Sequence, residues 1–90
     1  MIDRIRQAVR AQRYRLSLHA IEEMAEDELE SDDIEEVVLT GQVASRFTLD
    51  PRGVRYEVVG DTLDGRRACI VCRFLTGGQL LVITAYAIEG

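Results

Sequence analysis

His19, the only histidine of the chain, lies in a segment whose residue types could support acid–base chemistry. Glu22, Glu23 and Glu26 follow it at three, four and seven residues, so in a helix they would lie on its face or close beside it. An imidazole, with an unperturbed pKa of about 6.5, exchanges protons at neutral pH, and Glu23, one turn later, could orient it. A surface ion pair has the same spacing, so the pattern alone supports both readings.

Three helices are expected in the first half of the chain. The helix that carries His19 covers residues 17–27, where Ser17 is a good N-cap. Apolar residues recur there at helical spacing: Leu18, Ile21, Met24 and Ala25. A basic helix over residues 1–12 precedes it, and residues 14–16 are expected to be a short connector. A third helix is expected to have Ser31 as its N-cap and Gly41 as its C-terminal stop.

From Gln42 onward the apolar period changes to two, which indicates strands. Turn signals at residues 50–53, 64–65 and 76–78 divide this half into four strands. We therefore expect an α+β fold, with the N-terminal helices packed on one face of a four-stranded, mostly antiparallel sheet. The whole of residues 1–90 is expected to form a single domain.

The last two strands predict which sheet face stays open. The more apolar alternating sets are assigned to the helix-covered core: Ala68, Ile70, Cys72 and Phe74 on the third strand, and Leu81, Ile83, Ala85 and Ala87 on the fourth. The other face would then display Arg67, Arg73, Thr84 and Tyr86 together. Guanidinium groups beside a tyrosine on an open sheet suit a phosphodiester and a stacked base. An ordinary polar sheet face would have the same pattern.

Charge is distributed unevenly along the chain, although the net charge is only −5. Residues 1–15 hold five arginines and one acid, residues 16–45 hold ten acids and no arginine, and residues 46–90 hold six arginines and five acids. Because the chain has no lysine, every positive side chain is a guanidinium suited to phosphate or carboxylate, although codon bias would also explain this. Arg6, Arg10 and Arg13 share one side of the first helix, either as a solvated face or as a phosphate-tracking stripe.

Several classes of function lack support in the sequence. Cys69 and Cys72 form a CxxC by letter, but residues three apart in a strand point to opposite faces and cannot share a zinc ion. No Gly-rich phosphate loop or nucleophile elbow is present, so we expect no metal and no cofactor. No apolar run approaches a membrane span, no secretory signal is seen, and two cysteines fit a reducing cytoplasm.

Short motifs, in a specific order and spacing, extend over most of residues 16–88. They are Leu18-His19-Ala20, Glu23-Met24, Asp27, Asp33-Ile34-Glu35-Glu36-Val37, Gly41-Gln42-Val43, Asp64-Gly65-Arg66 and Ile83-Thr84-Ala85-Tyr86. This series resembles a prokaryotic domain-of-unknown-function family. That family looks related to small RelE- and BrnT-like toxins of the microbial ribonuclease fold, which are often encoded beside a small antitoxin, in some cases one with a zinc ribbon.

The resemblance implies a toxin of a type II toxin–antitoxin system that acts as a metal-independent endoribonuclease on mRNA. By this resemblance His19 and Tyr86 match functional positions of the motif. We expect His19 to exchange a proton, Glu23 to orient it, and Tyr86 to stack a base or act as an acid. Arg73 would stabilise the developing charge, and the remaining RNA contacts are expected from Arg66, Arg67 and Thr84. The partners implied are RNA and a cognate antitoxin, and homo-oligomerisation stays open.

The chain departs from the commoner form of this motif, because Glu23 and Asp27 stand where other members carry arginine. The acidic residues favour either an acid–base role for Glu23 or no catalysis at all. Two alternatives therefore accompany the ribonuclease. One is a non-catalytic interaction module that binds a partner through its acidic helices, and the other is a nucleic-acid-binding accessory protein that uses the arginines of the first helix.

Overall fold

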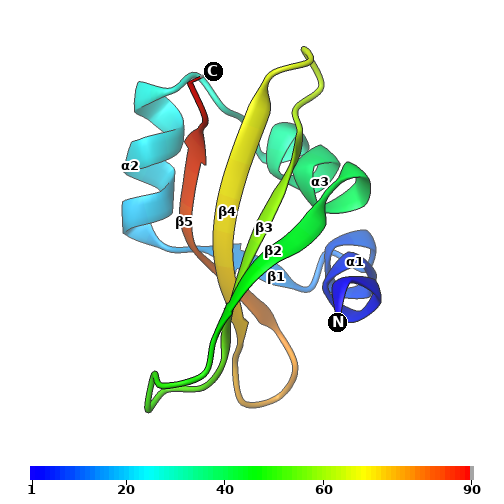
Figure 1. Cartoon of the computed structure of the whole chain (residues 1–90), viewed down its shortest axis with the longest axis vertical. Coiled ribbons are helices and arrows are strands. Elements are labelled where there is room, and N and C mark those ends of the chain that lie inside the picture. Colours follow the sequence, from blue (N-terminus) through cyan, green and yellow to red (C-terminus); the bar gives the residue numbers. More distant parts are fainter. Residues whose placement is uncertain (90) are drawn as a thin grey trace.

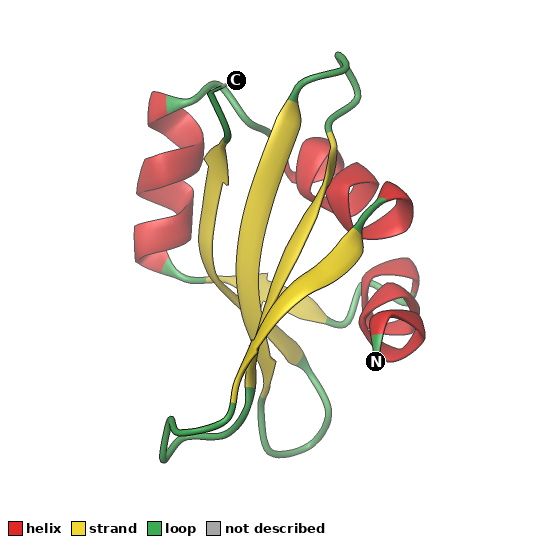
Figure 2. Ribbon diagram, in the orientation of Figure 1, coloured by secondary structure: helices red, strands yellow, loops and turns green. Residues whose placement is uncertain are grey.

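The computed structural model describes residues 1–89, and Gly90, the last residue of the expected domain, lies outside the described residues. Three helices and five strands follow one another along the chain (Figures 1 and 2). In order they are α1 (Ile2–Arg10), β1 (Tyr14–Leu16), α2 (Leu18–Glu26), α3 (Ser31–Thr40), β2 (Gln42–Phe47), β3 (Arg55–Asp61), β4 (Arg67–Phe74) and β5 (Leu80–Ala87).

The strands form one open sheet in the order β1-β5-β4-β3-β2. The expected α+β class is confirmed, but the expected number of four strands is wrong. The predicted connector Tyr14–Leu16 is a fifth strand, which pairs in parallel with the start of β5 from Leu80 to Val82. Backbone hydrogen bonds extend this pairing at both ends, since Leu80 N–H donates to Arg13 O (3.0 Å) and Ser17 N–H donates to Val82 O (2.9 Å).

The helices do not all cover the same part of the sheet. α1 and α3 lie together on one face, whereas α2 lies beside β5 at the other side of the molecule (Figure 1). The core combines side chains from these three helices with alternate residues of the central strands, such as Val58, Ile70 and Cys72. The opposite face of β3, β4 and β5 is not covered by a helix of the described chain, and we call it the open face.

A β-bulge shifts the alternation along β5. Val71 pairs with Thr84 but the next residue, Cys72, pairs with Val82, so Ile83 is an extra residue. Val82 is consequently fully buried, while Leu81 and Ile83 are only half-buried. The assignment of Leu81 and Ile83 to the core was therefore wrong, because the alternation read from the sequence assumed an uninterrupted strand.

The residue that follows α3 has no room for a side chain. Gly41 follows α3 as expected, and a Cβ atom there would lie only 2.3 Å from Val37 O. A Cβ atom at Gly60 of β3 would lie 2.2 Å from the same oxygen. Glycine at both positions therefore lets the end of α3 lie directly against β3. At the other end of α3 the N-cap is Glu30 rather than Ser31.

α1 and α2 are each followed, two residues after the helix ends, by a residue with a positive φ angle that is not glycine. Gln12 has φ 57° and Glu28 has φ 55°. After each of them the chain turns back, with Arg13 N–H donating to Ala8 O (2.8 Å) and Leu29 N–H donating to Met24 O (2.8 Å). This is the hydrogen bond that closes a Schellman motif, and it determines where the chain goes after each helix.

Candidate functional site

α2 covers the part of β5 that β1 is too short to reach. The carboxylate of Glu23 accepts a hydrogen bond from Ala85 N–H (3.1 Å), and that of Asp27 accepts one from Ala87 N–H (2.8 Å). The two acids are four residues apart, a rise of about 6 Å along the helix, and the two alanines are two residues apart, about 6.6 Å along the strand. The spacing of the carboxylates therefore nearly equals that of the N–H groups that they accept from. The acidic residues that depart from the family motif therefore serve as acceptors for the strand edge.

Ser17 connects the start of α2 to the same strand. Its hydroxyl accepts a hydrogen bond from Ala20 N–H (3.0 Å), as expected of an N-cap, and donates to Ile83 O (2.7 Å). α2 thus runs along β5 with three polar contacts in sequence. Because α2 packs against a strand edge, its buried residues are Ala20 and Met24, while Leu18 and Ile21 are exposed.

His19 lies on the first turn of α2, and its neighbour Glu23 contacts the backbone of β5 at the edge of the sheet, a place that we call the rim of the open face. Its Nε2 atom is 3.2 Å from Glu23 Oε1, so the contact expected from the spacing is present. The imidazole is 64% exposed and the Glu23 side chain 23%, which leaves the ring accessible to a ligand. One carboxylate oxygen therefore contacts both the imidazole and the backbone of β5.

Tyr86 follows Ala85 on β5 and pairs across the open face with Cys69 of β4. A hydrogen bond with the Cys69 thiol is the main reason why the pKa of Tyr86 is raised to about 12, and the charges of Glu57 and Glu23 contribute to the same shift. Burial in turn raises the pKa of the Cys69 thiol. Tyr86 is therefore a neutral hydroxyl donor at physiological pH, in the electrostatic range of the Glu23 carboxylate that contacts His19.

The arginines expected to bind RNA are placed unequally. Arg67 pairs with Asp61 at 2.9 Å. Arg66 donates to the carbonyl oxygens of Asp27 (2.7 Å) and Glu28 (2.9 Å) and pairs with Asp64, so it is engaged at the C-terminal end of α2. These contacts give both guanidinium groups a structural role, and an RNA contact through either would compete with it.

Thr84 and Arg73 both lie on the open face, and Arg73 is the more distant of the two from Tyr86. Thr84 is opposite Val71, and Arg73 is opposite Leu81. Arg73 is four residues from Cys69 along β4, which corresponds to roughly 13 Å of strand. Within residues 1–89 Arg73 has no acidic partner, and its one hydrogen bond is to Arg52 O at 3.5 Å. The structure therefore brings His19 and Glu23 into contact, with the charge of Glu23 acting on Tyr86, and leaves Arg73 further along the face.

Glu57 is a candidate functional residue that the sequence reasoning missed. It lies on the open face of β3 opposite Val71, and its charge contributes to the raised pKa values of Tyr86 and Cys69. In the described part of the chain it forms no ion pair. The alternation of residues 54–59 could have identified it, because it places Glu57 on the face of Arg55 and Val59. The open face thus carries both signs of charge.

The remaining expected features are the arginines of α1, the two cysteines, and the metal and membrane predictions. Arg6 donates to Val38 O (3.2 Å) and Gly41 O (2.8 Å) at the end of α3, so it does not continue a stripe with Arg10 and Arg13. Cys72 belongs to the core and Cys69 to the open face, as the strand alternation predicts. Among residues 1–89 no three His, Cys, Asp or Glu side chains are grouped as metal ligands, and no helix there has the length and apolar character of a membrane span.

Comparison with known proteins identifies the family but no characterised relative. A family model described as "Domain of unknown function (DUF4258)" matches residues 16–87, which include α2, α3 and the strands β2 to β5 but not α1. No curated protein and no solved structure matches the chain. The chain therefore belongs to the DUF4258 family of domains of unknown function.

Proposed function

We propose that this protein is a metal-independent endoribonuclease that cleaves mRNA, with a RelE/BrnT-like fold and the role of toxin in a type II toxin–antitoxin system. One observation carries the proposal: the Glu23 carboxylate contacts both His19 and the backbone of β5 next to Tyr86. The only imidazole of the chain is thereby held at the rim of an open sheet face that displays a neutral tyrosine hydroxyl.

The reaction that suits these groups is attack of an RNA 2′-hydroxyl on the neighbouring phosphate. His19 accepts the proton of the 2′-hydroxyl while the O2′–P bond forms and the P–O5′ bond breaks. The Tyr86 hydroxyl donates a proton to the departing O5′ and is reprotonated from the imidazolium or from water. The products are a 2′,3′-cyclic phosphate and a 5′-hydroxyl, so the step requires no metal and no added reactant.

Positive charge for the phosphorane comes from the same face. Arg73 is the stronger candidate, since it has no acidic partner among the described residues. Arg67 could contribute only by exchanging its contact with Asp61 for one with RNA. Loss of one charge-stabilising donor costs roughly 2.7–4 kcal/mol in transition-state stabilisation in enzymes of other classes, so Arg73→Ala should measurably slow cleavage.

A non-catalytic interaction module is the second candidate, favoured by a different observation. Leu18 is 72% exposed and Ile21 is 49% exposed, and both lie on α2 beside His19. Exposed apolar residues next to each other are typical of a surface that a protein partner covers. In this role the protein would bind its partner, such as an antitoxin, without cleaving RNA.

Overexpression of the protein and of matched variants tests the proposal. The wild type should arrest growth and deplete mRNA, and His19→Ala and Tyr86→Phe should each relieve the arrest. Arg10→Ala is the control, because Arg10 is exposed on α1 and contacts neither residue. Circular dichroism and thermal melting of each variant show whether folding is intact. A harmless wild type that leaves mRNA intact would reject the ribonuclease, and antitoxin binding without toxicity would favour the interaction module.

A further inference from the structure

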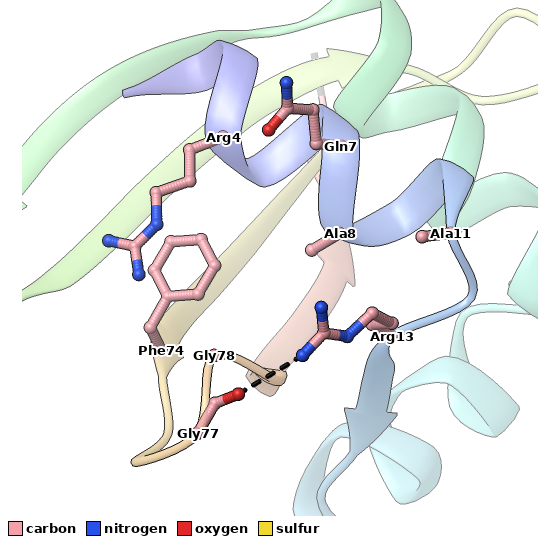
Figure 3. A pocket seen from close by; sticks show the side chains of 8 residues that line it. All are labelled: Arg4, Gln7, Ala8, Ala11, Arg13, Phe74, Gly77 and Gly78. Carbon is pink, nitrogen blue, oxygen red and sulfur yellow. Dashed lines mark hydrogen bonds between the residues drawn. The ribbon is translucent and has the colours of Figure 1, made fainter.

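A second site candidate lies between α1 and the turn that joins β4 to β5. Here the surface forms an open hollow of about 370 Å³ (Figure 3). It is lined by Arg4, Gln7, Ala8, Ala11, Arg13, Phe74, Gly77 and Gly78. None of these residues belongs to the His19 region, and all of those up to Arg13 precede residues 16–87, the part of the chain matched by the family model. The hollow is therefore a separate feature of this chain.

All charged side chains that line the hollow are arginines. The Arg4 guanidinium stacks on the Phe74 ring, 3.9 Å from its centroid, and Arg13 Nη2 donates to Gly77 O at 3.2 Å. Figure 3 shows the Arg4 side chain beside the Phe74 ring and the Arg13 side chain reaching the turn at Gly77. Neither arginine pairs with an acid within residues 1–89. A guanidinium has five N–H donors, so most of their hydrogen-bonding capacity is available to a ligand.

Local backbone geometry keeps the hollow open. Gly77 and Gly78 have φ angles of 99° and 90°, which residues with a side chain rarely adopt, so no side chain fills this wall. The small side chains of Ala8 and Ala11 leave room on the helix side. Gln12, with φ 57°, turns the chain back after α1 and directs Arg13 over the turn.

We propose that this hollow binds a phosphate group of a single RNA strand, held between Arg4 and Arg13. Guanidinium forks bind phosphate through paired charge-assisted hydrogen bonds, and the flat Arg4–Phe74 stack offers a platform for a neighbouring base. β1 joins the hollow to the rim of the open face, since Arg13 precedes it and His19 follows it. The six residue-to-residue steps from Arg13 to His19 span at most roughly 20 Å, which a strand of several nucleotides covers.

RNA as the source of the phosphate rests on the proposed function, whereas phosphate binding itself does not. Binding is therefore measured without cleavage, in a His19→Ala background. A labelled single-stranded RNA of roughly 12 nucleotides is the first probe. Arg4→Gln with Arg13→Gln should weaken its binding about ten-fold or more and reduce the slope of log K against log salt by about 0.7, the value for one phosphate contact.

The matched control is Arg10→Gln with Arg15→Gln, which removes the same charge from two exposed arginines of the same segment. It should weaken RNA binding clearly less than the substitutions in the hollow. Equal or greater weakening by the control would overturn the site, because general attraction would then explain the binding. Thermal melting of both variants confirms that each is folded.

Inorganic phosphate is the second probe, followed through the backbone amide NMR signals of Gly77 and Gly78. Both signals should shift with phosphate in the parent protein and stay in place in the Arg4/Arg13 variant. Absence of a shift in the parent with both phosphate and RNA would overturn the proposal. If the wild type binds RNA here but does not cleave it, only the proposed function fails. If it cleaves RNA but the hollow variant binds normally, only this inference fails.

Discussion

The two ends of β1 lead to regions of opposite character. Beyond its C-terminal end, at the rim of the open face, the acidic side chains have partners, since Glu23 contacts His19 and Ala85 N–H while Asp27 contacts Ala87 N–H. Before its N-terminal end, at the hollow, Arg4 and Arg13 have no acidic partner in the described residues. Carboxylates at the rim therefore hold the helix to the strand edge, whereas the arginines of the hollow contact only an aromatic ring and a backbone carbonyl.

Substitution of His19 should have the largest effect on the cleavage rate and should thereby distinguish the rim from the hollow. His19→Ala should lower the cleavage rate about 10²–10⁴-fold, the usual cost of one general acid or base. The melting temperature should stay unchanged because the imidazole is 64% exposed. Substitutions in the hollow should instead act mainly on KM. Single-turnover RNA cleavage with excess protein measures the difference, and a His19→Ala variant that cleaves like the wild type would remove the rim as the active site.

Substitution of Glu23 tests whether the rim holds the fold. Glu23→Ala leaves Ala85 N–H without its acceptor, so the free energy of unfolding should fall by about 1–3 kcal/mol. Glu23→Gln keeps a carbonyl acceptor and should lose less than half as much, although it removes the charged partner of His19. Arg13→Ala in the hollow should have a smaller effect than Glu23→Ala, because it loses one exposed contact. Urea unfolding measures the free energy of unfolding of the three variants. The comparison would be contradicted if Arg13→Ala lost the most.

Alkaline pH probes the hydroxyl at the rim. Because the pKa of Tyr86 is raised from 10.0 to about 12, this tyrosine ionises more readily in the unfolded chain than in the folded one. Its contribution to stability is complete below pH 10 and is lost as the pH rises to about 12. The urea midpoint of wild type should therefore fall more steeply across this window than that of Tyr86→Phe. Parallel curves would mean that the Cys69 contact does not act on Tyr86.

The smallest change in stability is expected from substitutions where the chain turns back after α1 and α2. Glu28, at the end of α2, has a φ angle that costs a residue with a side chain roughly 1–2 kcal/mol. Glu28→Gly should stabilise the fold by about 0.5–1 kcal/mol, since glycine relieves this cost but adds freedom to the unfolded chain. Gln12→Gly, next to the hollow, should gain less because the Gln12 side chain also contacts Val9 O. Thermal melting gives the order, and a destabilised Glu28→Gly would contradict it.

Short-range sequence patterns predicted the parts of the structure that depend on spacing within one element. The contact between His19 and Glu23 follows from helical spacing, and the separate faces of Cys69 and Cys72 follow from strand alternation. The helix–sheet order and the turns could be read in the same way. These features require no knowledge of distant neighbours.

Features that depend on neighbours distant in the sequence could not be predicted. β1 has three residues, too few to show a period, and is defined by its partner Leu80–Val82. The bulge at Ile83 arises only from pairing with β4. Arg66 looked free for RNA but is held by the end of α2, and this contact joins residues far apart in the chain. The hollow likewise requires α1 to meet the β4–β5 turn.

Chemical analysis of the cleaved RNA ends tests the central claim most directly. Purified protein is incubated with a defined mRNA in the presence of a chelator, beside His19→Ala as the matched control. If His19 promotes attack by the 2′-hydroxyl, the wild type should yield 2′,3′-cyclic phosphate and 5′-hydroxyl ends, and His19→Ala should yield almost none. Fragments with 3′-hydroxyl and 5′-phosphate ends, or cleavage abolished by the chelator, would contradict a metal-independent active site at the rim.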